Sequence, residues 1–278
     1  MTRRLLPSLI GLCAHAVLFT GALIMLAPFL WMALTSFKPP AEIFTGEIAL
    51  LPSRFTLQNY VEALSASPLL RFLLNGVLVC GGILVLQLAI AVPCGYALAK
   101  LDFRGREALF GLVLLALLIP VQVPALPLYL GLARLGLLDS YPALVLPWAV
   151  SAFAIFLFRQ VFRRFPDEIV DAARIDGFGE IAIAFRIALP SAWPAVAAFS
   201  IFSVVAHWND LYWPMVVVTS TELMTPPLGI AYFREGGGVD GNVGALMAGG
   251  VIISAPLVVA FLFAQRRFVQ GLAFTGIR

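Results

Sequence analysis

Charged side chains are scarce in this sequence. Asp, Glu, Lys and Arg make up 12% of its 278 residues, whereas 61% are hydrophobic. The mean hydropathy of +0.98 lies well outside the balance of a soluble domain. A formal net charge of +3 is also too small to indicate a nucleic-acid-binding protein. The composition therefore predicts an integral membrane protein.

The side chains of catalytic and metal sites are scarce too. The sequence has two His and three Cys, and it contains neither a CxxC pair nor a Cys/His cluster with metal-ligand spacing. Cys13, Cys80 and Cys94 lie inside apolar runs, so we expect small buried side chains there. A GxxxxGK[ST] loop is absent, which excludes ATP binding by a P-loop. We therefore expect a chain that is not an enzyme and holds no cofactor or metal, so that its energy source is another subunit.

Six apolar runs are each long enough to cross a membrane, since a transmembrane helix needs about 20 apolar residues. They cover residues 8–36, 69–99, 108–133, 142–163, 193–219 and 243–264. The first run is longer than the apolar region of a signal peptide, so we expect it to be an uncleaved span. Prolines inside several runs predict kinked, closely packed helices. The sequence thus predicts one all-α transmembrane domain of six helices over residues 1–278.

Lys and Arg are unevenly divided between the two sides of this six-span arrangement. Thirteen of the 18 fall on one side, which holds both termini and the loop "KLDFRGRE" at 100–107. The positive-inside rule places that side, and with it both termini, in the cytoplasm. Four Trp residues lie near predicted span ends, a position typical of an aromatic belt: Trp31, Trp148, Trp193 and Trp213.

One charged stretch interrupts the apolar runs on the predicted cytoplasmic side. Residues 166–190 read "PDEIVDAARIDGFGEIAIAFRIALP". Pro166 suits the first turn of a helix, and the acidic pair after it complements the helix dipole. At helical spacing follow Ile169, Ala172, Ala173 and Asp176. The two alanines predict a shallow face that another protein could approach closely.

A second short helix is expected after a glycine turn at Gly177 and Gly179, because glycine enters the left-handed region without steric cost. Its apolar stripe would hold Ile181, Ala184, Phe185 and Ala188, and Pro190 would end it before the next span. Such an amphipathic pair either lies on the membrane surface or docks on a partner, and its physical properties leave both readings open.

The segments "DAARIDG" and "RIALP" resemble the EAA motif of permease subunits of ATP-binding cassette (ABC) importers, in its sugar-transporter form. Asp171 stands where the family usually has Glu, which keeps the carboxylate but shortens its reach. The resemblance implies that residues 164–190, and within them 166–189, form a coupling segment seated on the ATP-hydrolysing subunit. The residues implied to couple are Asp171, Ala172, Ala173, Arg174, Asp176, Gly177 and Phe178.

Further blocks extend the resemblance over nearly the whole chain, among them "CGYALAKLDFRGRE" (94–107), "LGLLDSYPALVLP" (135–147), "WNDLYWP" (208–214) and "QRRFVQGLAFTGIR" (265–278). Together they are similar to the second permease of binding-protein-dependent sugar importers of the maltose type. The resemblance implies a type I importer permease fold in the bacterial inner membrane and a sugar or sugar-like solute, such as a polyol phosphate, as substrate.

The same resemblance implies three protein partners: a second homologous permease, an ATPase dimer that binds ATP and Mg, and an extracytoplasmic solute-binding protein. Membrane lipid surrounds such a chain, and nucleic acid has no part in its function. The C-terminal tail at 265–278 is expected to contact the ATPase through Gln270, Gly271 and Gly276. Phe274 and Thr275 depart from the family pattern there.

Polar residues inside the apolar runs are candidates for a substrate path, because burying them in lipid is costly. Trp208, Asn209 and Asp210 in the fifth run and Asn75 in the second combine an aromatic face with hydrogen-bonding groups, as sugars require. The alternative is interhelical hydrogen bonding that holds the two permeases together, and Asn75, Gln87 and Gln122 present the same choice. His207 is expected to be a packed or interfacial side chain. A different function class, a gradient-driven secondary transporter, would use Asp210.

Overall fold

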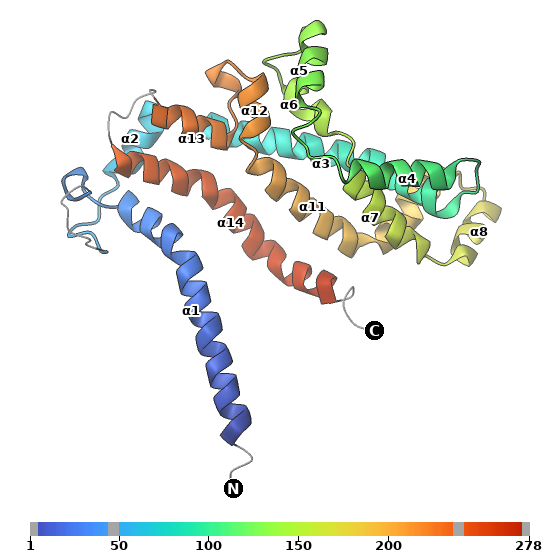
Figure 1. Ribbon diagram of the computed structural model, residues 1–278, viewed down its shortest axis with the longest axis horizontal. Coiled ribbons are helices and arrows are strands. Elements are labelled where there is room, and N and C mark those ends of the chain that lie inside the picture. The colour runs from blue at the N-terminus through green and yellow to red at the C-terminus, as the bar shows by residue number, and fades with distance from the viewer. Residues whose placement is uncertain (1–4, 44–49, 236–241, 274–278) are drawn as a thin grey trace. The chain divides into compact units, whose positions relative to one another are not determined.

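The computed structural model describes residues 5–43, 50–235 and 242–273, with side chains described for 11–43, 50–234 and 242–262. Every element of regular structure in these ranges is a helix, which confirms the all-α prediction (Figure 1). The contacts divide the chain into two compact units. One unit comprises residues 1–69 and 230–255, and the other comprises residues 70–229 and 256–278.

Three helices are by themselves long and apolar enough to cross a membrane: α1 (Leu5–Ser36), α3 (Leu69–Lys100) and α14 (Val243–Ala273). Two bent pairs also qualify when each is counted as one span. The first pair joins residues 141–148 to α7 (Ala152–Arg163) with a bend of 43°, and the second joins residues 180–191 to α11 (Trp193–Trp208) with a bend of 88°. The described residues thus contain three to five spans, where the sequence predicts six.

The predicted third run, 108–133, is divided into α4 (Arg106–Ala116) and α5 (Ala125–Arg134) by a stretch of turns. That stretch contains Pro120 and Pro124, and each proline removes a backbone donor and clashes with the preceding turn of a helix. The predicted fifth run is also divided, because α11 ends at Trp208 and α12 (Tyr212–Val217) begins a new helix, but no proline lies between these two helices. The kink expected from proline is therefore a complete break in the third run.

The remaining helical elements are short. They are η2 (Pro40–Glu42), α2 (Gln58–Ala66), α6 (Tyr141–Val145), η3 (Leu146–Trp148), α8 (Asp167–Ile175), α9 (Glu180–Ile183), the π-helical η4 (Ala184–Ala188), α10 (Leu189–Ser191), η5 (Thr221–Leu223) and α13 (Pro226–Glu235).

In the first unit, a buried asparagine closes the end of the first span. Asn59, which is fully buried, donates from its side-chain nitrogen to the carbonyls of Ser36 at 2.9 Å and Lys38 at 2.8 Å. It thereby satisfies carbonyls at the C-terminal end of α1 that have no partner within the helix. The described side chains of α1 from Leu12 to Trp31 are exposed. An apolar helix with such a surface must face lipid or another subunit.

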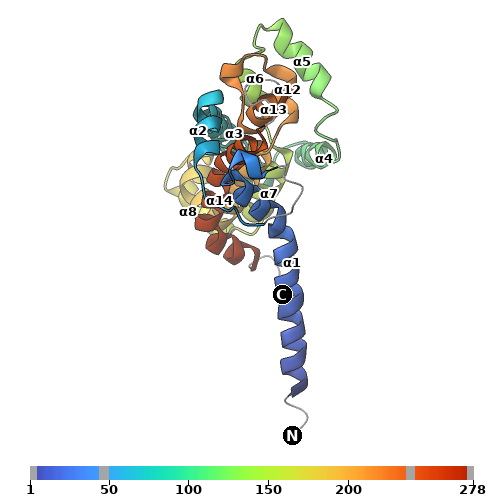
Figure 2. The same cartoon turned by 90° about the vertical axis from the view of Figure 1, so that its left-hand side faces the viewer.

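In the second unit, the core is built where α3, α7, α8 and α11 meet. Its buried side chains include Tyr96 of α3, Phe158 and Phe162 of α7, Val170 of α8 and Phe199 of α11. Gly95 lets α3 and α7 approach closely, because a Cβ there would lie 2.8 Å from the Cβ of Phe158. α4 lies against α7 (Figures 1 and 2). The segment at 164–190 is therefore packed directly on the ends of three apolar helices.

Two expectations about single side chains are wrong. Cys80 is buried as predicted, but Cys13 and Cys94 are exposed, because the apolar runs that carry them present those faces outward. Trp213 is not part of a surface belt: it is 1% exposed and donates its indole N–H to the carbonyl of Ala143 at 2.9 Å. Burial of a Trp is stable when its N–H has such a partner.

Candidate functional site

The charged stretch folds as the predicted helix, turn and second helix. α8 runs from Asp167 to Ile175, directly after Pro166, with Asp167 and Glu168 in its first turn and Arg174 in its last. Acidic groups at the N-terminus and a basic group at the C-terminus both stabilise the helix dipole. The local sequence therefore suffices to explain where this helix begins and ends.

The buried face of α8 differs from the prediction. Val170 is 1% exposed and Ala173 is 5% exposed, and both belong to the core of the unit. Successive residues on a helix point about 100° apart, so Ala172, which is exposed, cannot share that face. The prediction that Ala172 and Ala173 form one docking face is thus wrong, because Val170, three residues before Ala173, selects the buried side. The outward face carries Asp171, Ala172 and Ile175.

Gly177 makes the predicted turn. Its φ is +85°, in the left-handed region, and two backbone hydrogen bonds close the end of α8. The N–H of Phe178 donates to the carbonyl of Ala173 at 3.0 Å, and the N–H of Gly177 donates to the carbonyl of Arg174 at 3.0 Å. This pair of bonds is the Schellman motif. Gly179 instead has extended backbone and immediately precedes α9.

A network of charged and polar groups ties the two short helices to each other and to α3. The Nη1 of Arg174 donates to Asp171 at 3.0 Å, and its Nε donates to Glu180 at 2.8 Å. The hydroxyl of Tyr96 donates to the other oxygen of Glu180 at 2.8 Å. Hydrogen bonding to Glu180 is the main reason why the pKa of Arg174 lies above its ordinary value. The guanidinium therefore remains charged at any physiological pH.

A second tie fixes the start of α8 to the end of α3. The Nζ of Lys100, the last residue of α3, donates to the carbonyl of Phe165 and to Asp167, both at 2.5 Å. The Lys100 side chain is 5% exposed. Near its C-terminal end, α3 thus binds α8 through Lys100 and α9 through Tyr96, so both short helices are tied to the same long helix.

The second helix continues further than predicted. Pro190 was expected to end it, yet helical structure extends through α10 to Ser191. Proline has no N–H to donate to the carbonyl four residues earlier, here that of Arg186. The preceding residues widen into the π-helical η4, a form that commonly marks functional bends. Of the expected stripe, Ala184 and Ala188 are buried, but Ile181 is 71% exposed.

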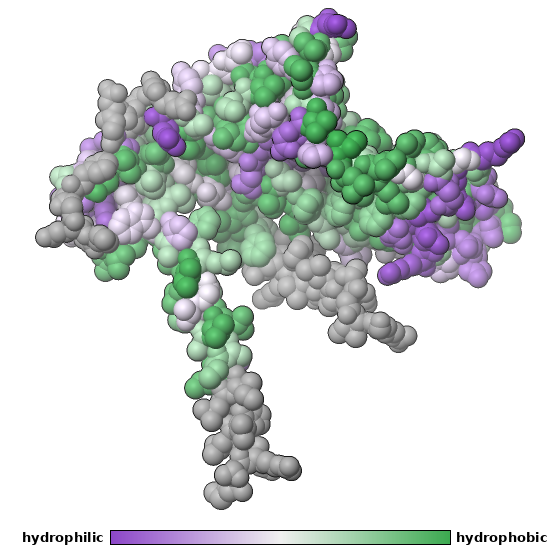
Figure 3. Space-filling model, in the orientation of Figure 1, coloured by the Kyte–Doolittle hydropathy of each residue, from purple (hydrophilic) through white to green (hydrophobic). Residues whose placement is uncertain are grey.

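Large apolar side chains lie exposed at the surface of this otherwise charged segment. They are Ile169, Ile175, Phe178 and Ile181, and Ile175 is 87% exposed. Figure 3 shows hydrophilic residues gathered at the same end of the second unit, around α8. Apolar groups set in a polar rim are typical of a protein-docking surface. We call the exposed face formed by these four side chains with Asp171 and Ala172 the α8–α9 surface.

The residues proposed for a substrate path do not form one open site. Asn75 is fully buried and donates to the carbonyls of Glu222 and Met224, each at 2.9 Å. Its oxygen accepts the hydroxyl of Tyr141 at 2.7 Å. The amide is thus engaged on both sides in joining α3 to the segments at 141 and 222–224. These bonds join segments of one chain, so the alternative of bonding between two permeases stays a prediction.

The three residues of the fifth run differ in exposure. Trp208 is buried, Asn209 is exposed, and Asp210 is half-buried. Asn209 donates to the carbonyl of Val205 at 2.8 Å. Asp210 accepts the backbone N–H of Trp213 at 3.3 Å, at the start of α12. Only Asn209 among them presents a polar side chain fully to the surface.

Gln87 is the centre of a buried polar cluster that the sequence left undecided. Its amide nitrogen donates to the carbonyl of Trp148 at 3.0 Å, and its oxygen accepts the hydroxyl of Ser203 at 2.7 Å. His207 lies 3.3 Å from the same amide nitrogen and is packed against the Trp148 ring, as expected for a packed histidine. The cluster joins α3, the bend before α7, and α11.

The side chains of the C-terminal tail lie outside the described residues. Gln270 and Gly271 lie on the described backbone of α14, but their side-chain environment is not described, and Gly276 lies outside the described residues. Their expected contact with an ATPase therefore stays a prediction.

Known proteins resemble the chain over its whole length. The family model described as the binding-protein-dependent transport system inner membrane component matches residues 91–274. The arabinooligosaccharides transport system permease protein AraQ of Halalkalibacterium halodurans is 38% identical and is aligned over 100% of both chains. The sn-glycerol-3-phosphate transport system permease protein UgpE of Yersinia pestis is 32% identical over 93% of this chain and 94% of the relative.

The fold is also found in solved structures. A chain from the crystal structure of a bacterial ABC transporter involved in the import of the acidic polysaccharide alginate matches with a TM-score of 0.82 and 24% identity. The match covers 94% of this chain and 97% of that chain. Taken with the family match over more than half of the sequence, these likenesses show that the chain belongs to the inner membrane components of binding-protein-dependent transport systems and has the fold of an ABC importer permease.

Proposed function

We propose that this chain forms half of the translocation pathway of an ATP-driven importer for an oligosaccharide or a sugar-like solute. Relatives of similar length carry names that specify arabinooligosaccharides, diacetylchitobiose and sn-glycerol-3-phosphate. Each of these solutes carries hydroxyl groups that can form hydrogen bonds. A second homologous permease, an ATPase dimer and an extracytoplasmic solute-binding protein would complete the importer.

The α8–α9 surface is the observation that supports this proposal best. It exposes Ile175 and Ile181 on a segment held in place by the Schellman turn, the Arg174 network and Lys100. A rigid apolar surface can receive a partner without a large ordering cost. Closure of the ATPase dimer on ATP would then move α8, and α3 would carry that movement into the membrane.

We infer the orientation of the chain from its charge distribution. In the predicted six-span arrangement, 13 of the 18 Lys and Arg residues lie on the side that bears the α8–α9 surface. The positive-inside rule places this surface and both termini in the cytoplasm of a bacterium, where ATP is available. ATP and Mg would be bound by the partner subunit, since the sequence has no P-loop.

The gradient-driven alternative has less support. It requires a carboxylate in the span that is free to exchange a proton or an ion, whereas Asp210 accepts the backbone N–H of Trp213 and so fixes the start of α12. A carboxylate in this position is explained by local structure alone.

The test is ATP hydrolysis by the complex in lipid, with and without a sugar-loaded binding protein. Ile175→Asp should abolish copurification of the ATPase, because a desolvated carboxylate would replace an apolar contact. Arg104→Ala, a change on the same side outside the segment, is the matched control and should leave the complex intact. A complex that survives Ile175→Asp unchanged would contradict the docking role. Sugar uptake without any ATPase would contradict the proposed function itself.

A further inference from the structure

A polar cavity of about 180 Å³ lies where the ends of α3, α4 and α7 meet, and no residue of the α8–α9 surface lines it. It is lined by Leu98, Ala99, Arg106, Glu107, Arg159 and Arg163. Three arginines and one glutamate give this lining a formal charge of +2. One water molecule needs only about 10–15 Å³ of such a cavity, so a considerably larger anionic group fits.

Arg159 gives the cavity a fixed wall. It is 4% exposed, donates to the carbonyl of Leu98 at 3.2 Å, and contacts both oxygens of Glu107 at 3.2 and 3.4 Å. Its guanidinium also lies 3.5 Å from the centre of the Phe110 ring. Hydrogen bonds, an ion pair and a cation–π contact thus hold one positive charge at the cavity in a single orientation.

Arg106 is paired more fully than Arg159. It lies 3.4 Å from Glu107, which it shares with Arg159, and 4.0 Å from the exposed Asp102, and it donates to the carbonyl of Leu101 at 3.1 Å. Arg163 makes no hydrogen bond or ion pair with any side chain that the structure describes. A guanidinium whose donors are unused is suited to bidentate binding of a phosphate. The cavity is therefore complementary to an anion.

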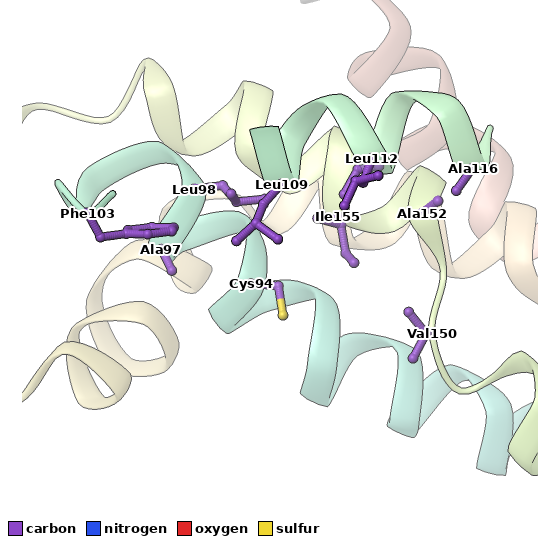
Figure 4. A pocket seen from close by; sticks show the side chains of 11 residues that line it. Cys94, Ala97, Leu98, Phe103, Leu109, Leu112, Ala116, Val150, Ala152 and Ile155 are labelled. Atoms are coloured by element: carbon purple, nitrogen blue, oxygen red, sulfur yellow. The ribbon is translucent and has the colours of Figure 1, made fainter. Parts of the chain in front are cut away.

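An apolar groove of about 420 Å³ lies between the same three helices. Its lining comprises Cys94, Ala97, Leu98, Phe103, Leu109, Leu112, Val113, Ala116, Val150, Ala152 and Ile155. Figure 4 shows the labelled side chains on α3, on α4, at the start of α7 and, for Phe103 and Val150, on the segments between helices, with the sulfur of Cys94 among carbon atoms. Leu98 lines both the groove and the polar cavity.

The two hollows continue into each other along the helices. On α7, Ala152 and Ile155 line the groove, and the next residues on that face, Arg159 and Arg163, line the cavity. On α4, Arg106 lies at the cavity, and Leu109 and Val113 follow it on the same face in the groove. An apolar trough thus ends in a basic cavity at the side of the membrane where positive residues gather.

We propose that this composite site binds an anionic phospholipid, with its phosphate in the basic cavity and one acyl chain in the groove. A basic hollow between membrane helices on the cytoplasmic side has the chemistry that recognises anionic headgroups. A helix from another subunit could cover the groove, but it would leave the positive charge of the cavity without an anion. An amphiphile with a negative headgroup matches both parts at once.

The basic cavity lies next to the connection between α7 and α8. α7 ends at Arg163, and α8 begins at Asp167. A lipid phosphate bound by Arg163 holds the end of α7, and thereby the point from which α8 departs.

The first test is lipid retention by the intact complex, purified with its partner subunits and measured by native mass spectrometry. Complexes are equilibrated with phosphatidylglycerol and phosphatidylethanolamine. Arg163→Gln should weaken phosphatidylglycerol retention roughly five-fold, since one basic side chain contributes about that factor at an anionic membrane surface. Arg164→Gln, the adjacent exposed arginine outside the lining, is the matched control and should not. Equal retention by the two variants, or binding of inorganic phosphate without selectivity for the lipid, would overturn the proposal.

The second test locates the acyl chain. Phosphatidylglycerol with a photoactivatable group on its chain should form adducts on Leu109 to Ala116 of α4, and Cys94→Trp, which fills the groove, should abolish them. Adducts that persist in Cys94→Trp, or that form only elsewhere, would contradict the groove assignment. Protection of the groove by a peptide of another subunit would show that a protein helix occupies it and would likewise overturn the proposal.

Discussion

The hydroxyl of Tyr96 and the carboxylate of Glu180 lie 2.8 Å apart, although 84 positions separate them in sequence. Tyr96 belongs to the membrane helix α3, and Glu180 is the first residue of α9. Because Glu180 also binds Arg174 of α8, one carboxylate joins a span to both helices of the α8–α9 surface. This bond is a direct mechanical link between the proposed docking surface and the membrane.

Tyr96→Phe removes that link without changing the shape of the core. The loss of one hydrogen bond should lower the free energy of unfolding by about 1 kcal/mol, since Glu180 keeps Arg174 as a partner. ATP hydrolysis should become less dependent on the loaded binding protein, because α9 is no longer tied to α3. Thermal unfolding and ATPase assays of the reconstituted complex measure the two effects. Tyr129→Phe on α5, where no hydroxyl partner is described, is the control. Unchanged coupling in Tyr96→Phe would show that Lys100 alone suffices.

Gly177→Ala should destabilise the turn between α8 and α9. The residue has φ +85°, and no atom lies within 4 Å of an added Cβ, so the cost is conformational strain of about 1–2 kcal/mol rather than a clash. Gly177→Asn should cost less, because Asn tolerates the left-handed region better. Gly179→Ala has equal space and an ordinary negative φ, so it should be nearly neutral. Thermal unfolding of the three variants checks this order, and equal effects at 177 and 179 would contradict it.

Local signals explain what the sequence could predict of the α8–α9 surface. The acidic first turn, the basic last turn and Gly177 define α8 and its end without reference to the rest of the chain. The buried face could not be chosen in this way, because Val170 and Ala173 are buried in a core whose other members come from distant parts of the sequence, among them Tyr96 and Phe162. Glu180 was missed as a site residue for the same reason, since its partner Tyr96 lies in a distant span.

Two of the predicted spans are divided in the structure, because hydropathy does not register helix breaks. The run at 108–133 is apolar throughout, yet Pro120 and Pro124 lie between α4 and α5. In the run at 193–219, Asp210 accepts a backbone N–H that starts α12, so a side chain competes with the continuing helix. The substrate-path residues were chosen by polarity, which does not separate an open amide from one such as Asn75 whose bonds are all made within the chain.

Gly95→Ala should disturb the contact between α3 and α7. An added Cβ would lie 2.8 Å from the Cβ of Phe158 and 2.9 Å from the backbone nitrogen of Arg159, and neither atom is the end of a flexible side chain. Such overpacking costs about 1–3 kcal/mol of stability. Gly81→Ala in the same helix meets no atom within 4 Å and is the control. Thermal unfolding in detergent should separate the two, and equal stability would mean that α3 and α7 can move apart freely.

The contact between Asp139 and residues 219–220 should make the stability of the chain sensitive to acid. Its Oδ1 accepts the backbone N–H groups of Thr219 and Ser220, each at 2.9 Å, and the Ser220 hydroxyl at 3.0 Å. These bonds, the Ser220 backbone first, hold the pKa of Asp139 below its ordinary value. A lowered folded-state pKa stabilises the chain above the unfolded-state pKa, and this stability is lost as the pH falls through the folded-state value.

Asp139→Asn tests this directly, because Asn also accepts the left-handed φ of 54° found at this position but carries no charge. At neutral pH the variant should unfold at a lower temperature than the unchanged chain. The difference should shrink as the pH is lowered past the ordinary range of an aspartate, near 4, because the native carboxyl then becomes neutral as well. All other carboxylates are common to both proteins and cancel in the comparison. A difference in unfolding temperature that stays constant down to pH 3 would show that the charge of Asp139 does not strengthen these bonds.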